Sequence, residues 1–89
     1  MVLPEGIKKI GQKAFRGCTA LEEIEIPEDL TVILEEAFYG CSGLSHVTLP
    51  QSLKWIEEDA FTDCISLKTI QIPQDIYIAS DAFKDCKNR

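Results

Sequence analysis

Apolar and polar residues alternate in three short segments of the chain, each followed by a proline. The segments are residues 21–26 (LEEIEI), 44–49 (LSHVTL) and 67–72 (LKTIQI). The last three residues of each read apolar, polar, apolar, which is the period of a half-buried β-strand, and β-branched residues are common among them. The proline that follows has no N–H to donate, so it ends strand pairing at the same place each time. The pattern predicts one short strand in each segment.

A second apolar pair follows each proline, after a short polar turn such as Glu28-Asp29. The pairs are Ile7/Ile10, Leu30/Ile33, Leu53/Ile56 and, compressed by one missing residue, Ile76/Ile78. We expect this part of the chain to cross the opposite side of each unit, either extended or as an irregular turn.

Each unit then carries an Ala-Phe pair, with a cysteine three residues after the phenylalanine. These pairs begin at positions 14, 37, 60 and 82, and the cysteines are Cys18, Cys41, Cys64 and Cys86. The spacing places Phe and Cys on one face of a helical turn. A single helical turn is therefore expected in each unit, with its end at Gly17, Gly40, Asp63 and Asp85.

The proline, the apolar pair and the Ala-Phe-x-x-Cys pattern occur four times. Prolines stand at positions 4, 27, 50 and 73, an interval of 23 residues, and the last unit is one residue short before its Ala-Phe pair. Self-similarity at this period is typical of a solenoid, in which each coil buries its apolar face against its neighbours. The chain is thus expected to form one domain over 1–89, with units 4–26, 27–49, 50–72 and a partial unit 73–89, and with the phenylalanine rings stacked through its core.

The four cysteines should form a column, one in each coil. Equivalent positions of adjacent coils lie about 4.8 Å apart, whereas the Cβ atoms of a disulfide lie about 3.8 Å apart and its side chains turn toward each other. Buried reduced thiols are the favoured interpretation, because cysteine packs as a small hydrophobic side chain. A disulfide and a metal site are the alternatives, and a linear column is a poor tetrahedral cage for zinc.

Composition and charge exclude several classes of function. The 89 residues are 45% apolar and 27% charged, as in ordinary globular proteins, and the formal charge of -6 argues against nucleic-acid binding. No apolar run approaches the roughly 18 residues of a membrane span, and no secretory signal begins the chain, so neither membrane insertion nor export is predicted from these residues.

Chemistry-bearing motifs are also missing from the sequence. Phosphate-binding loops, nucleophile elbows and Cys-His pairs do not occur, and the acidic groups lack the spacing of a calcium loop. His46 has no second histidine or matched nucleophile. No enzyme activity, catalytic residue, metal or cofactor is therefore expected.

The strand, proline, isoleucine pair and Ala-Phe-x-x-Cys together resemble the BspA-like, or Treponema pallidum-type, leucine-rich repeats. The resemblance implies an α/β repeat solenoid, a short right-handed coil with a parallel sheet on the concave side and short helical turns or irregular segments opposite. It also implies a recognition role at the cell surface or in a secreted parent protein. Three complete units and a partial one suggest a fragment, or a small protein that covers its ends by self-association. Met1-Val2-Leu3 would then occupy a strand position.

Two surfaces could bind a partner. Strand alternation points one set of side chains away from the core on the concave face, namely Glu23, Glu25, His46, Thr48, Thr69 and Gln71. Trp55 lies in one row with Lys9 and Val32, and Tyr77 or Ile78 continues that row. Trp55, Tyr77 and the nearby Tyr39 form a possible interface. The leading hypothesis is a non-enzymatic protein-protein interaction module, and the alternative is a self-assembly unit joined through uncapped ends or the Trp55 row. Both sets of residues could instead be simple surface, solvated on the sheet or covering the fourth coil.

Overall fold

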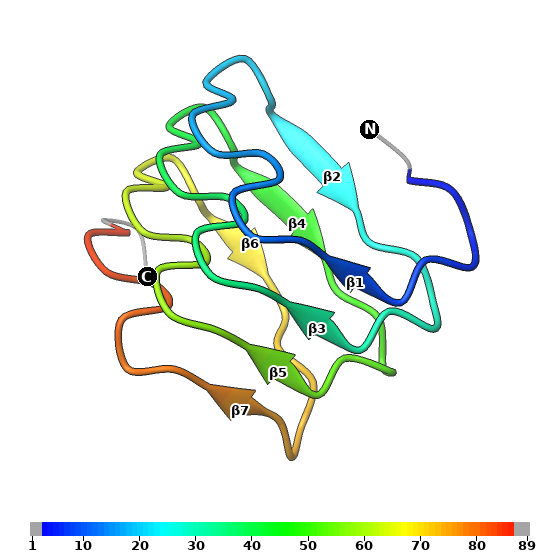
Figure 1. The fold of residues 1–89 in the computed structure, drawn as a ribbon. Coiled ribbons are helices and arrows are strands. Elements are labelled where there is room, and N and C mark those ends of the chain that lie inside the picture. Colours follow the sequence, from blue (N-terminus) through cyan, green and yellow to red (C-terminus); the bar gives the residue numbers. More distant parts are fainter. Residues whose placement is uncertain (1–2, 87–89) are drawn as a thin grey trace.

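The protein is a short stack of coils; the first three each contain two strands and an irregular turn segment, and the fourth contains the single strand β7 (Figure 1). The structure is a computed structural model that describes residues 3–86, apart from the side chain of Thr69. Most of the strand expected over Met1-Val2-Leu3 therefore lies outside the described residues. The strands are β1 (Lys9–Ile10), β2 (Glu23–Glu25), β3 (Val32–Ile33), β4 (His46–Thr48), β5 (Trp55–Ile56), β6 (Thr69–Ile70) and β7 (Tyr77–Ile78).

Two parallel sheets run along the stack. The strands expected before each proline form a three-stranded sheet in the order β2-β4-β6, and the second apolar segments form a four-stranded sheet in the order β1-β3-β5-β7. The prediction of a parallel sheet is confirmed, but the prediction of one strand per coil is wrong. Because adjacent coils lie one strand spacing apart, their backbone N–H and C=O groups can form hydrogen bonds with each other on both sides of the core. Two forms were expected for the second segment, an extended strand or an irregular turn, and the structure has the extended strand.

The register of the four-stranded sheet shows where the short fourth unit loses its residue. Lys9 pairs with Val32 and Val32 with Trp55, each 23 residues further on, whereas Trp55 pairs with Tyr77, 22 residues on. The missing residue therefore belongs to the turn between Pro73 and Tyr77. Beyond that turn the chain returns to the common register, because Ile78 pairs with Ile56 as Ile56 pairs with Ile33.

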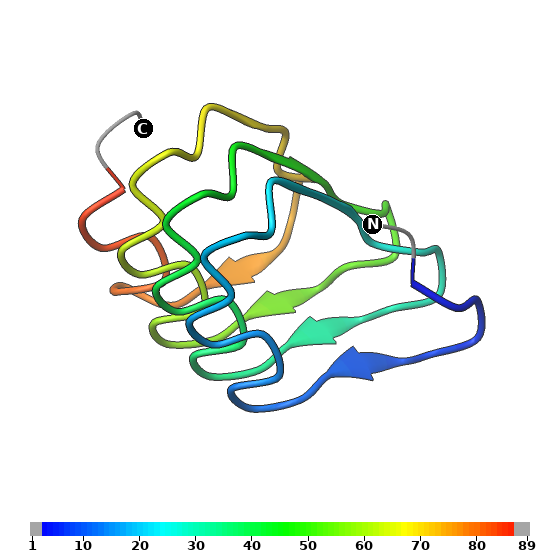
Figure 2. The same ribbon diagram turned by 90° about the horizontal axis from the view of Figure 1, so that it is seen from above.

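No α-helix forms in the Ala-Phe segments or elsewhere in residues 3–86. Successive amides donate alternately within the coil and to the next coil: Arg16 N donates to Lys13 O at 3.2 Å, whereas Phe15 N donates to Ala37 O at 2.7 Å. The continuous hydrogen bonding of an α-helix, from each amide to the carbonyl four residues earlier, cannot form when every second amide donates to the next coil. The predicted helical turn is replaced by the irregular segments that were its alternative, and these stack along one side of the molecule (Figure 2).

Left-handed backbone residues interrupt these segments at one position in all four coils and at a second position in the first three. The predicted turn-ending column adopts positive φ throughout, with 73° at Gly17, 73° at Gly40, 64° at Asp63 and 61° at Asp85. A second column, which sequence reasoning did not find, has φ of 59° at Lys13, Glu36 and Asp59. Both columns break right-handed helical geometry, because residues visit the left-handed region singly and not as helices.

The core contains a continuous column of phenylalanine rings, as predicted. The ring centroids of Phe15 and Phe38 lie 5.2 Å apart, those of Phe38 and Phe61 5.0 Å, and those of Phe61 and Phe83 5.2 Å, with interplanar angles of 5° or less. Phe38 and Phe61 are completely buried, while Phe15 in the first coil is only partly buried. Each internal ring is thus enclosed by its counterparts in the coils before and after it.

Candidate functional site

The three-stranded sheet presents exposed polar side chains in two aligned rows, which we call the polar face: Glu23, Glu25, His46 and Thr48. Glu23 pairs with His46 and Glu25 with Thr48 in the parallel register. Between the rows, Ile24 and Val47 are buried in the core, at 2% and 4% exposure. The period of a strand thus sends alternate residues to opposite sides of the sheet.

The remaining two residues of the predicted concave face extend this surface less regularly. The backbone of Thr69 continues the row of His46 in β6. Gln71 is exposed but lies one residue beyond the end of that strand. The structure therefore places the backbones of five of the six predicted residues in regular strand register, and Gln71 lies at the margin.

A hydrogen bond orients the imidazole on the polar face. The Ser45 hydroxyl donates to the Glu22 carbonyl oxygen at 3.2 Å, and Ser45 Oγ lies 2.8 Å from His46 Nδ1. Which atom donates in the second contact depends on the tautomer of the imidazole. Ser45 therefore links the His46 ring to the backbone of the preceding coil.

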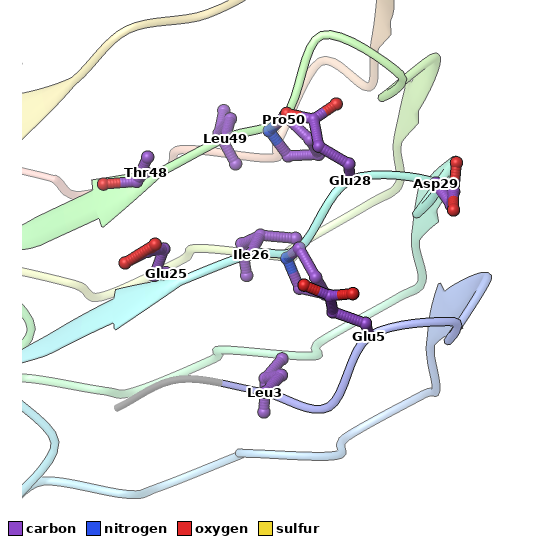
Figure 3. Close-up of a pocket in the computed structure, with 10 residues that line it drawn as sticks. Leu3, Glu5, Glu25, Ile26, Glu28, Asp29, Thr48, Leu49 and Pro50 are labelled. Atoms are coloured by element: carbon purple, nitrogen blue, oxygen red, sulfur yellow. The ribbon is translucent and has the colours of Figure 1, made fainter.

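A groove opens beside the polar face where the strands end at their prolines, and we call it the proline groove (Figure 3). It has a volume of about 320 Å³. Its lining combines half-buried or buried apolar residues with exposed acidic ones: Leu3, Glu5, Glu25, Ile26, Pro27, Glu28, Asp29, Thr48, Leu49 and Pro50. Glu25 and Thr48 belong to both surfaces, so the groove is continuous with the polar face. Sequence reasoning assigned Glu28-Asp29 to a solvated turn and missed this groove, because its walls come from three different coils.

The four-stranded sheet carries the second predicted surface. Trp55 and Tyr77 are adjacent in register and are 48% and 55% exposed. Tyr39 lies on a turn segment instead, where the Arg16 guanidinium carbon lies 4.8 Å from the centre of its ring. Arg16 Nε also pairs with Glu36 Oε1 at 3.0 Å. The structure thus places Trp55 and Tyr77 together and gives Tyr39 a contact of its own within the chain.

The cysteine column consists of thiols, as favoured by the sequence, and no disulfide links its members, all of which lie in the described part of the chain. Each buried sulfur donates to a carbonyl of the preceding coil: Cys41 to Phe15 O at 3.0 Å, Cys64 to Phe38 O at 3.1 Å, and Cys86 to Phe61 O at 3.0 Å. Burial raises the pKa of Cys41 to about 11 and that of Cys64 to about 12. Cys18, in the first coil, is exposed.

Residues 3–86 contain no group of three or more His, Cys, Asp or Glu side chains placed to hold a metal ion. They also contain no helix of the length and apolarity needed to cross a membrane.

Comparisons with known proteins agree with this geometry. The whole chain, residues 1–89, matches the sequence profile of the BspA type leucine rich repeat region, in six copies. No curated protein matches the chain significantly.

Several solved structures are similar. A T. pallidum leucine-rich-repeat protein is 34% identical, with a TM-score of 0.93 over 99% of this chain and 44% of its own. A leucine rich cell surface protein from Faecalibacterium prausnitzii is 32% identical, with a TM-score of 0.93 over 99% of this chain and 24% of its own. A leucine-rich-repeat protein from Bacteroides capillosus is 31% identical, with a TM-score of 0.80 over 91% of this chain and 65% of its own.

The chain therefore spans less than two thirds of the length of each of these relatives. The match to the repeat profile covers the same residues that build the two sheets and the phenylalanine column. This chain belongs to the BspA-type family of leucine-rich-repeat proteins.

Proposed function

We propose that this chain is a non-enzymatic protein-binding module that holds its partner on the polar face. The observation that supports the proposal is the register of Glu23 with His46 and Glu25 with Thr48, which presents differing side chains on a repeated backbone frame. Leucine-rich repeats generally serve protein interaction, and repeat proteins use such extended sheet surfaces for partners. Specificity would come from the side chains that vary between coils.

We further propose that the parent protein acts at a cell surface, in an adhesion role. Support comes from the similar F. prausnitzii structure, which is a leucine rich cell surface protein. The polar face fits contact with another protein better than turnover of a small molecule. Its exposed carboxylates, imidazole and hydroxyl can form the polar contacts common in protein interfaces, and the one serine beside His46 is bonded to the backbone.

Replacing Thr48 with arginine should weaken binding to a protein partner about tenfold, because a long charged side chain would occupy the centre of the polar face. Surface plasmon resonance against immobilised collagens, laminin, fibronectin and fibrinogen would measure this. The control is Glu58→Gln, which changes the net charge by the same amount at an exposed turn away from that face. A partner that binds Thr48→Arg as tightly as wild type would contradict the polar face as its site. Absence of binding to every protein of the panel would count against the proposed adhesion role.

A second candidate function, self-assembly, is favoured by the exposed pair Trp55 and Tyr77. Under our proposal wild type and Trp55→Ser should both be monomers of about 10.0 kDa at high concentration. Light scattering after size-exclusion chromatography would test this, with Lys9→Ser as a control in the same row of the sheet. A larger wild-type mass that returns to the monomer value only in Trp55→Ser would favour the assembly function instead.

A further inference from the structure

We propose that the proline groove binds a basic side chain of the partner, with arginine favoured over lysine. The proposal rests on the proposed function, because Glu25 and Thr48 belong to both the polar face and the groove. It goes further by naming the chemistry that the partner must present. Three properties of the groove support the proposal: how the groove forms, its negative charge, and the different charge of the next hollow along the stack.

The groove exists because the prolines separate the strand ends. Ile26 N donates to Thr48 O at 2.9 Å, and the next residue of that coil, Pro27, has no N–H with which to continue the pairing. Beside these strand ends, Leu3 and Leu49 remain only partly buried. The result is an apolar floor in a groove of about 320 Å³, at the lower end of the range of roughly 300–1,000 Å³ found for ligand pockets.

The charge around this floor is negative and uncompensated. Glu5, Glu25, Glu28 and Asp29 line the groove, while no lysine, arginine or histidine of the described residues does so. None of these four carboxylates forms an ion pair with another residue of the described chain. Figure 3 shows their side chains distributed around the apolar residues and not gathered at one point.

This combination fits a long basic side chain. The aliphatic part of lysine or arginine packs on apolar surface while its charged end stays at the rim. Arginine suits the site better, because its planar guanidinium forms bidentate hydrogen bonds with carboxylates. A small metal ion fits poorly, since the carboxylates are not grouped as a coordination site, and an anionic ligand would be repelled.

The turns of the third and fourth coils form a second hollow in which the charge is different. It is lined by Gln51, Lys54, Ile72, Pro73, Gln74 and Asp75. Glutamine replaces glutamate at the two positions that follow the prolines, and Lys54 is present. The preference for a basic group should therefore be confined to the first three coils, which gives the partner a defined orientation along the stack.

The experiment is a titration of the intact protein, followed through backbone amide resonances, with the peptide acetyl-Gly-Arg-Gly-amide. The matched neutral peptide carries citrulline, which keeps the shape of arginine and removes its charge. We expect saturable shifts at Glu25, Glu28, Asp29 and Thr48, with affinity for the arginine peptide at least about fivefold above that for the citrulline peptide. Equal affinity for both peptides, or no saturable shift, would overturn the proposal.

Paired variants test the site itself. Glu25→Gln/Glu28→Gln should weaken arginine-peptide binding by about fivefold or more, whereas Glu35→Gln/Glu58→Gln, with the same change of charge at turns outside the groove, should change it less than twofold. Similar losses in both double variants would show general charge attraction and contradict a specific groove. If Thr48→Arg abolishes binding to a matrix protein while Glu25→Gln/Glu28→Gln leaves that binding intact, the groove proposal fails and the proposed function stands.

Discussion

Replacing Phe38 with alanine is expected to lower the free energy of unfolding by about 3–5 kcal/mol, the usual cost of truncating a buried aromatic side chain. Phe38 is completely buried, and its ring stacks on Phe15 at 5.2 Å and on Phe61 at 5.0 Å. Truncation would leave a cavity and interrupt the column at an internal position. Since small domains are stable by only about 5–15 kcal/mol, the variant should be close to unfolding at room temperature.

Phe15→Ala is the matched control for this prediction. Phe15 occupies the equivalent position in the first coil. It is only partly buried, and its ring stacks on Phe38 alone, on one side. Urea unfolding followed by circular dichroism should show a loss for Phe15→Ala that is less than half of the loss for Phe38→Ala. Equal losses, or an unchanged unfolding midpoint for Phe38→Ala, would contradict a core built on stacked rings.

Raising the pH from 8 to 10.5 is expected to remove about 4 kcal/mol of stability through Cys41 and Cys64 alone. Burial raises their pKa values from 9.0 to about 11 and about 12. Above pH 9 the unfolded chain loses the thiol protons that the folded chain keeps, so ionisation favours unfolding. The contribution is therefore fully present below pH 9 and is lost as the pH rises through the folded pKa values.

Urea unfolding at pH 8 and pH 10.5 measures this loss, and Cys41→Ala/Cys64→Ala is the control variant. All other side chains are the same in the two proteins, so the difference between their pH dependences isolates the two thiols. The variant should be less stable at pH 8, because it loses buried sulfur atoms, but it should lose about 4 kcal/mol less on going to pH 10.5. The same pH dependence in both proteins would contradict buried, neutral thiols.

Much of the fold could be predicted because the sequence repeats. Residues that recur at one interval must occupy equivalent environments, so the 23-residue period predicted a stack of coils, and the alternation of Glu23, Ile24 and Glu25 predicted a strand with one buried and two exposed residues. The shared phenylalanine position predicted the ring column. The positive φ of Gly40 likewise followed from its place at the end of a turn.

The features that could not be predicted depend on contacts between coils. The pair Leu30 and Ile33 is compatible with either a strand or a turn, and pairing of Ile33 with Ile10 and Ile56 makes the segment extended. Likewise, the Ala-Phe-x-x-Cys spacing fits a helical turn taken alone. The helix does not form because Phe38 N donates to Ala60 O of the next coil, at 2.7 Å.

The candidate site divides in the same way. Alternation within one strand determined that Glu25 and Thr48 face away from the core, because the side-chain period of a strand is local. The proline groove was decided by tertiary structure, since Glu5, Glu28 and Leu49 come from three coils that meet only when the chain is stacked. The sequence by itself thus determined the coil, the column of rings and the outward direction of the strand residues. The stacking of coils decided the second sheet, the absence of helix and the groove, because hydrogen bonds and hollows between coils arise only from neighbours distant in the chain.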